Sequence, residues 1–449
     1  MSTHDPTATA TATATSYDQL RRGVQERLRE ANLDGDREPD RVRALIGGVV
    51  HDYQQAALAG LGGFPLRDPD DMTARLARSV LGYGPLEQFF GDEAPVVEVE
   101  IRGAEISWKD DRGRWHASDE PTTAEELRAV VDRLLQPTGR ALTEAHPIVS
   151  TQVLDRQVRL TASIPPVSDE LEANLRFYRI RWESLHDLVA WDTLTQPAAN
   201  FCWALMRHPK TGVLVSGRPQ SGKTTFLNAL LRVVPGTHKV ACCEDTRELH
   251  APLMHISYRK TRPRSGLGDG EAEITLRDLI ALTLRSSPER IVVGEVRGGE
   301  AAELTRAANA GTAVLCTLHA HAAADALDSL VNAALLGDHG MPAEAVRSIF
   351  SRTIDVVIHL DCEDVELHGS ADERPIRRQV MEIAAVSPLQ GNEHHFTVIP
   401  IFERTEVGAP LLWTRNPLPP QLHARLDQLL RRYGTSAQAV LDGQEVIRQ

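Results

Sequence analysis

Apolar residues recur at helical spacing in the first part of the chain. The series that begins at Tyr17 has the three- and four-residue steps of one helix face, and two more such series follow it. The last one ends at GYGP, residues 82–85, which is a turn sequence. The pattern therefore predicts a helical module over residues 17–88. The polar, repetitive residues 1–16 are expected to form a disordered tail.

The pattern then changes to an alternation of apolar and polar residues, which is typical of half-buried strands. It begins at Val97, and a hairpin is expected over residues 106–116. TAEE at 123–126 has the form of a capping box and predicts the start of a helix. Two further strands are expected, and the whole predicts a small α+β domain over 89–185, with those strands at 151–164 and 175–182.

Beyond this domain, short apolar runs alternate with amphipathic helical patterns. Such an order predicts a mostly parallel sheet with helices on both faces, here over residues 186–430. A proline-rich stretch then precedes a last helix, which is expected as a C-terminal tail over 431–449. The predicted architecture is an α/β domain preceded by a small α+β domain and an N-terminal helical module.

Composition limits the classes of function. The chain has 449 residues, which is enough for two or three domains, and its 42% hydrophobic and 25% charged residues are those of an ordinary globular protein. A net charge of −13 with 5% aromatic residues argues against a nucleic-acid binder, which needs a basic track with stacking side chains. No apolar run approaches the roughly 18 residues that span a bilayer. We therefore expect a cytoplasmic protein without a transmembrane segment.

A phosphate-binding motif lies between a predicted strand and a predicted helix. TGVLVS at 211–216 suits a buried strand, FLNALLRVV at 226–234 has helical spacing, and the residues between them match G-x-x-x-x-G-K-[ST]. The backbone N–H groups of such a loop can bind phosphate oxygens, although a proline within it lacks this donor. The predicted nucleotide-binding residues are Gly217, Arg218, Pro219, Gln220, Ser221, Gly222, Lys223, Thr224 and Thr225. In this motif the lysine reaches the β and γ phosphates of ATP, and the hydroxyl after it ligates Mg²⁺.

Two other predicted strands of this region end in acidic residues, and a third ends in a histidine. The strands over 238–243 and 290–294 run into Glu244 and Glu295, and His319 follows the third. Because the carboxyl ends of parallel strands share one edge of the sheet, these side chains are expected beside the bound nucleotide. There a carboxylate can orient a water for attack on the γ phosphate or hold a metal-bound water. A lone histidine is more often structural than catalytic, so the role of His319 needs support beyond its position.

These motifs, taken in order, carry a family resemblance over about residues 80–400. The chain is similar to the ATPases of the type II/type IV secretion superfamily, and within it most similar to the CpaF class, the motors that assemble tight-adherence (Flp) pili. In the first half the matching residues are GYGPL at 82–86, GR at 139–140, Pro147, Arg159 and IPP at 164–166. In the second half they are EDTREL at 244–249, TRP at 261–263, GEVRGGE at 294–300 and TLHA at 317–320.

The resemblance implies a RecA-like motor domain that binds ATP against the N-terminal domain within a ring, usually a hexamer. It implies Glu295 as the catalytic glutamate, Glu244 with Thr224 beside the Mg²⁺, and His319 as the histidine of the family's His box. It also implies Arg262 as a cation that reaches the phosphates. Inner-membrane platform proteins are the implied partners, and they would hold the protein at the cytoplasmic membrane.

The interpretation that fits best is an ATP-hydrolysing motor for pilus assembly or protein secretion. Two alternatives remain open. One is a divergent scaffold of the same assembly that hydrolyses ATP weakly or not at all, because Arg218-Pro219-Gln220 replaces the small residues usual in the loop and the family's Thr-Gly-His is absent at 310–312. The other, less favoured, is a nucleic-acid motor of the RecA-like type.

Overall fold

A computed structural model describes residues 6–33, 37–91, 94–111, 113–120, 122–154, 158–178, 183–262, 272–337, 340–364, 376–389 and 395–444. The chain divides into two compact units, Met1–Tyr178 and Arg179–Gln449. The division lies near the boundary expected after residue 185. Within the described ranges, no helix combines the length and the apolar character that crossing a bilayer requires.

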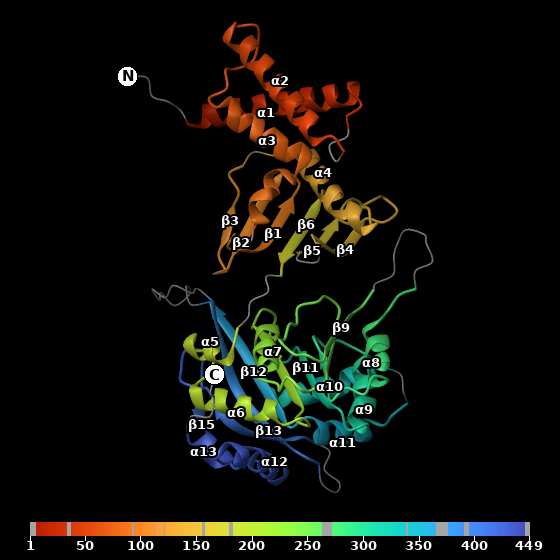
Figure 1. Cartoon of the computed structure of the whole chain (residues 1–449), viewed down its shortest axis with the longest axis vertical. Helices are drawn as coiled ribbons and strands as arrows, with labels where there is room; N and C mark the ends of the chain where they lie inside the picture. The colour runs from red at the N-terminus through yellow and green to blue at the C-terminus, as the bar shows by residue number, and fades with distance from the viewer. Residues whose placement is uncertain are drawn as a thin grey trace. The chain divides into compact units, whose positions relative to one another are not determined.

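Three helices open the first unit (Figure 1): α1 (Pro6–Glu30), α2 (Pro39–Leu58) and α3 (Pro69–Leu81). They share a core to which each contributes its apolar stripe, including Tyr17, Ile46 and Leu76. α1 begins well before Tyr17, so residues 6–16 differ from the disordered tail that was expected, while residues 1–5 lie outside the described part. Once a helix is nucleated, adding residues costs little, and alanine, which alternates with threonine here, is the best helix former.

The rest of the first unit is an antiparallel sheet with the order β3-β2-β1-β6-β5-β4, covered on one face by α4 (Ala124–Leu135). The strand expected over 151–164 is a hairpin of two strands, because the chain turns between Val153 and Val158. The alternation of apolar and polar residues continues on both sides of the turn and therefore hides it. The strands are β1 (Val96–Arg102), β2 (Glu105–Asp110), β3 (Trp115–Ala117), β4 (Ile148–Val153), β5 (Val158–Ser163) and β6 (Glu172–Phe177).

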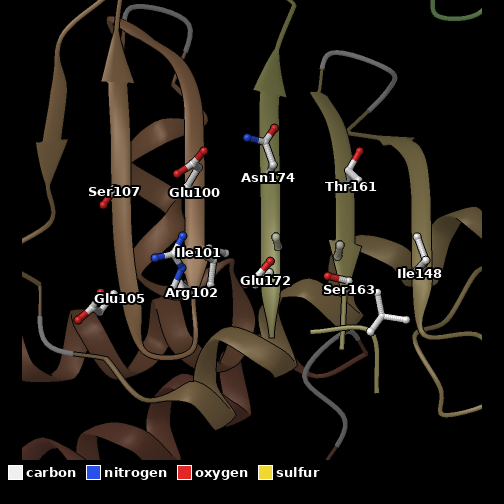
Figure 2. Close-up of a pocket in the computed structure, with 13 residues that line it drawn as sticks. Glu100, Ile101, Arg102, Glu105, Ser107, Ile148, Thr161, Ser163, Glu172 and Asn174 are labelled. Carbon is white, nitrogen blue, oxygen red and sulfur yellow. The ribbon is translucent and has the colours of Figure 1, made fainter. Parts of the chain in front are cut away.

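The face of this sheet opposite α4 is polar. This face carries a shallow pocket of about 480 Å³. Figure 2 shows side chains that line it, among them Glu100 and Arg102 of β1, Thr161 of β5, and Glu172 and Asn174 of β6. Residues that alternate with these along the strands are buried in the core. The period of two thus separates an apolar face from a charged one.

The second unit contains a large sheet (Figure 1). Its strands follow one another in the order β15-β14-β13-β12-β7-β11-β10-β8-β9. From β12 to β9 neighbouring strands are parallel, whereas β13, β14 and β15 extend the sheet by antiparallel pairing. The parallel strands are β7 (Val213–Gly217), β8 (Val240–Glu244), β9 (Ile256–Lys260), β10 (Arg290–Val293), β11 (Ala313–Leu318) and β12 (Val356–Asp364). The antiparallel ones are β13 (Ile376–Ser387), β14 (Thr397–Glu403) and β15 (Leu412–Trp413).

Helices cover both faces of this sheet, so the predicted α/β class is confirmed. Val213 and Val215 of β7 enter one core, and Leu214 between them enters the other. The first core includes α5 (Leu185–Ala190), α6 (Gln196–Arg207), α7 (Lys223–Arg232), α12 (Pro420–Leu430) and α13 (Ala437–Leu441). The second includes α8 (Leu276–Leu284), α9 (Ala301–Asn309), α10 (Ala323–Leu335) and α11 (Ala343–Thr353).

The end of the chain differs from the expected tail helix. A short 3-10 turn (Arg431–Tyr433) separates α12 from α13, and α13 buries Val440 and Leu441 in the first core. Because these apolar side chains share a core with those of α6, this segment is a part of the α/β unit. Residues 445–449 lie outside the described part.

Candidate nucleotide site

The phosphate-binding loop joins the central strand β7 to α7. Its backbone has positive φ angles at Gly217 (151°), Gln220 (64°) and Gly222 (91°). Gln220 is unusual, because residues with a side chain rarely adopt such angles. A Cβ at Gly217 would lie 2.2 Å from the carbonyl oxygen of Leu360 on β12. Only glycine therefore allows the loop to start so close to the neighbouring strand.

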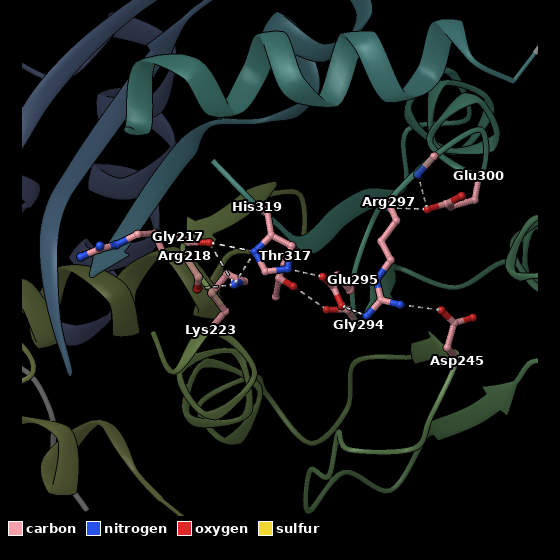
Figure 3. A network of polar contacts seen from close by, with 11 residues as sticks. Gly217, Arg218, Lys223, Asp245, Gly294, Glu295, Arg297, Glu300, Thr317 and His319 are labelled. Carbon is pink, nitrogen blue, oxygen red and sulfur yellow. Dashed lines mark hydrogen bonds and ion pairs between the residues drawn. The ribbon is translucent and has the colours of Figure 1, made fainter. Parts of the chain in front are cut away.

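Lys223 is the first residue of α7, and its side chain turns back onto the loop. Its ammonium donates to the carbonyl oxygens of Gly217 (3.0 Å) and Arg218 (2.8 Å) and lies 3.3 Å from Nδ1 of His319. Burial lowers the pKa of Lys223, and the charge of Glu295 opposes this. The predicted lysine, histidine and glutamate thus lie within one polar network (Figure 3).

His319 lies between the phosphate loop and Glu295. It follows β11, and its Nδ1 lies 3.2 Å from the carbonyl oxygen of Gly217. Its Nε2 lies 2.6 Å from Oε1 of Glu295. Glu295 follows β10, so the two side chains come from adjacent strands, as expected for the carboxyl edge of a parallel sheet.

The turn that carries Glu295 is fixed on both sides to β11. The hydroxyl of Thr317 donates to the carbonyl oxygen of Gly294 (2.6 Å), and the N–H of Val296 donates to the carbonyl oxygen of Thr317 (2.8 Å). These two bonds fix the backbone on either side of Glu295 to β11.

Arg297 contacts the other oxygen of the Glu295 carboxylate. Burial raises the pKa of Glu295, but the hydrogen bond and charge of Arg297, with the charges of His319 and Lys223, outweigh it and hold this pKa below its usual value. Arg297 also lies 3.9 Å from a carboxylate oxygen of Asp245, beyond β8. Glu295 is therefore ionised at neutral pH, and a cation from its own turn partly covers it.

Glu244, at the end of β8, is only 3% exposed. Its Oε1 accepts from the N–H groups of Glu248 and Leu249, both at 2.9 Å, whereas its Oε2 has no hydrogen-bond partner among the described residues. Burial raises the pKa of Glu244 to about 7, although the two N–H donors oppose it. A Cβ at Gly294 would lie 2.9 Å from the Cγ of Glu244, so the two predicted acids follow strands in close contact.

Arg262 is placed differently from the other predicted residues. It is exposed just beyond β9, the edge strand, and its guanidinium donates from Nε (3.1 Å) and Nη2 (2.9 Å) to the carbonyl oxygen of Ala272 in its own loop. The structure does not bring it into the network of Lys223, His319 and Glu295.

Sequence reasoning missed two contributors to the site. Arg297 lies inside the motif at 294–300, where the sequence alone does not predict its contact with Glu295. Asp361 follows an apolar run on β12 and binds the guanidinium of Arg218. An acid directly after an apolar run, the sequence signal shared by Glu244 and Glu295, also marks Asp361, although β12 continues beyond it to Asp364.

The loop and α7 fit a bound phosphate. The N-terminus of α7 has no side-chain cap, so its first N–H groups can bind an anion. Ser221 is buried, and its hydroxyl has no hydrogen-bond partner among the described residues. The hydroxyl of the half-buried Thr224 and Oε2 of Glu244, which has no hydrogen-bond partner among the described residues, are oxygen groups of the kind that Mg²⁺ prefers. This fold and this site define the class of the protein, a P-loop ATPase.

Comparison with known proteins gives the family. The model of the family described as "Type II/IV secretion system protein" matches residues 147–394, and the chain belongs to this family. A protein of Mycobacterium tuberculosis (strain CDC 1551 / Oshkosh), named as a candidate conjugal transfer protein, is 30% identical over 335 residues, which cover 72% of this chain and 90% of that protein. The type IV secretion system protein PtlH of Bordetella pertussis is 28% identical over 52% of this chain and 66% of its own length.

Two solved structures are also similar. The VirB11 ATPase of the Brucella suis type IV secretion system is 21% identical over 67% of this chain and 91% of that chain, with a TM-score of 0.35. The pilus retraction motor PilT, solved with ADP, is 18% identical over 79% of this chain and 88% of that chain, with a TM-score of 0.45.

Proposed function

We propose that this secretion-family ATPase is a motor that hydrolyses ATP to power pilus assembly or protein secretion through a membrane platform. The observation that carries the proposal is the polar chain from Lys223, at the start of α7, through His319 after β11 to Glu295 after β10. It places the lysine of the phosphate loop, a histidine and an ionised carboxylate at one edge, where the γ phosphate of a bound nucleotide would lie.

The proposed roles follow from the contacts of each side chain. Lys223 would exchange its bonds to the carbonyls of Gly217 and Arg218 for phosphate oxygens, which attract its charge more strongly. Glu295 would release Arg297 and orient the attacking water, with His319 holding its other oxygen. The Mg²⁺ that accompanies ATP neutralises the phosphate charge when bound. Thr224 and Glu244 are the residues proposed to hold it.

The finer assignments rest on the resemblance in sequence. Membership of the CpaF class, assembly into a hexameric ring, contact with inner-membrane platform proteins and a place at the cytoplasmic face of the membrane are all parts of the proposal. To reach the nucleotide, the guanidinium of Arg262 would have to break its hydrogen bonds to the carbonyl oxygen of Ala272. The relatives named for conjugal transfer and type IV secretion support an export system of this general kind.

Steady-state ATP hydrolysis by the purified chain tests the proposal. We expect turnover in the wild type and a loss on the order of 1,000-fold in Glu295→Gln, which keeps the shape of the side chain but cannot orient the water as a base. Glu344→Gln, an exposed acid on α11, is the matched control and should retain full turnover. Wild-type turnover that survives in Glu295→Gln would refute the assigned site. ATP binding without turnover in the wild type would instead favour the scaffold alternative.

A further inference from the structure

The residue that makes this phosphate loop atypical, Arg218, is bound to the neighbouring strand. Its Nε donates to Oδ1 of Asp361 (2.6 Å), and its Nη2 donates to the carbonyl oxygen of Cys362 (3.0 Å). Asp361 and Cys362 belong to β12, whose Leu360 lies opposite Gly217 in the parallel ladder. The guanidinium therefore continues the attachment of β7 to β12 by one residue, into the loop itself.

A second arginine holds the other half of the loop. Arg378 of β13 donates from its Nε to the carbonyl oxygen of Gln220 (2.9 Å). Its Cδ would lie 3.4 Å from a Cβ at Gly222, so the stem of the side chain runs along the loop. Gln220 is the residue with the unfavourable positive φ, and this bond stabilises the conformation that residue must adopt.

Both ties come from one structural element. β12 and β13 pair as a hairpin, and Arg378 stands opposite Cys362, which accepts from Arg218. The loop thus lies between this hairpin on one side and the network of Lys223 and His319 on the other. A phosphate loop is effective when its N–H groups are already oriented, because ordering them at the moment of binding reduces affinity.

We propose that Arg218 and Arg378 are positioning residues, through which the β12–β13 hairpin fixes the phosphate loop and so sets the affinity for ATP. They hold in place a loop that has Arg218-Pro219-Gln220 where small residues are usual. This inference rests on the proposed function, because it concerns the same nucleotide site. It assigns to Arg218 a bond to Asp361, and no contact with phosphate.

Arg218→Lys is a specific test, because lysine keeps the positive charge but cannot reproduce the two directed hydrogen bonds of the guanidinium. Binding of a fluorescent ATP analogue, mant-ATP, is measured for the full chain and for Arg218→Ala, Arg218→Lys, Asp361→Ala, Arg378→Ala and the double variant Arg218→Ala/Asp361→Ala. Arg352→Ala, which removes an exposed arginine from α11, is the matched control. Thermal unfolding of each variant is followed in parallel.

We expect Arg218→Ala, Arg218→Lys and Asp361→Ala each to raise the dissociation constant about fivefold, and the double variant to raise it no further. Arg378→Ala should weaken binding by a similar factor, while Arg352→Ala should not change it and the unfolding midpoints should stay close to that of the wild type. Normal affinity in Arg218→Lys would overturn the inference, because charge alone would then suffice. Additive effects of Arg218→Ala and Asp361→Ala would also overturn it.

The proposed function can fail separately from this inference. A wild-type chain that does not bind mant-ATP would reject the nucleotide site and the positioning roles together. Wild-type binding that is unchanged in Arg218→Ala and Arg378→Ala would reject the positioning roles and leave the nucleotide site standing.

Discussion

Glu126 in the first unit and Glu244 in the second are both almost completely buried, and the two differ in how their carboxylate oxygens are satisfied. In the first unit, Oε1 of Glu126 accepts from the hydroxyls of Tyr17 and Ser79, both at 2.5 Å, and Oε2 accepts from Thr122 at 3.2 Å. In the second unit, Glu244 has backbone donors on one oxygen and no partner among the described residues on the other.

The difference separates a structural acid from a functional one. Glu126 connects α1 and α3 to the first turn of α4, and the guanidinium of Arg75 lies 3.7 Å above the ring of Tyr17 beside it. Both carboxylate oxygens of Glu126 accept hydrogen bonds, so this side chain stabilises the unit and neither oxygen is left to bind a ligand. An oxygen without a partner in a buried carboxylate is costly, and such a cost persists mostly where a ligand is bound.

A conservative substitution of Glu244 tests whether this buried acid is functional. Glu244→Gln keeps an oxygen for the N–H groups of Glu248 and Leu249 but loses the charge proposed to hold the Mg²⁺. Turnover of ATP should fall by a factor on the order of 1,000, equivalent to about 4 kcal/mol, without loss of folding. Steady-state kinetics at saturating Mg²⁺ measures this, with Glu344→Gln as the control. Unchanged turnover would make Glu244 a structural acid like Glu126.

Removing the carboxylate of Glu126 tests whether this buried acid is structural. Glu126→Ala leaves the hydroxyls of Tyr17 and Ser79 buried without their acceptor, which should destabilise the first unit by about 3 kcal/mol. Glu125→Ala, the exposed neighbour in the same turn of α4, should change stability by less than about 0.5 kcal/mol. Urea unfolding followed by circular dichroism compares the two. Equal stability of both variants would show that the three hydroxyl bonds contribute nothing net.

Much of the candidate site could be predicted from the sequence because it depends on local pattern and on one topological rule. The strand and helix that flank the phosphate loop are evident from their apolar spacing. The ends of β8, β10 and β11 meet at one edge in any parallel sheet, so Glu244, Glu295 and His319 could be placed near Lys223 without coordinates.

The parts that could not be predicted depend on contacts between distant segments. The bond between Arg218 and Asp361 requires β12 to lie beside β7, an order that the alternation of strands and helices does not fix. The capping box expected at 123–126 forms only in part: Thr123 accepts from the N–H of Glu126, but the carboxylate turns to Tyr17 on another helix. Tertiary hydrogen bonds here outweighed a local motif.

The pH dependence of the unfolding free energy reports on the charge of Glu244 alone, and the change expected here is smaller than the other two. Its pKa is about 7 in the folded chain against a usual 4.5, so between these values the folded state keeps a proton that the unfolded state releases. The stabilisation from this proton is complete below pH 4.5 and is lost as the pH rises through 7, which amounts to about 2 kcal/mol between pH 5 and pH 7. Other groups titrate in the same range, and the difference between the wild type and Glu244→Gln removes them. In urea unfolding with EDTA and without nucleotide, we expect the stability of Glu244→Gln relative to the wild type to grow by about this amount over that range. A difference that stays constant with pH would mean that Glu244 is already ionised in the folded chain, as an acid with both oxygens satisfied would be.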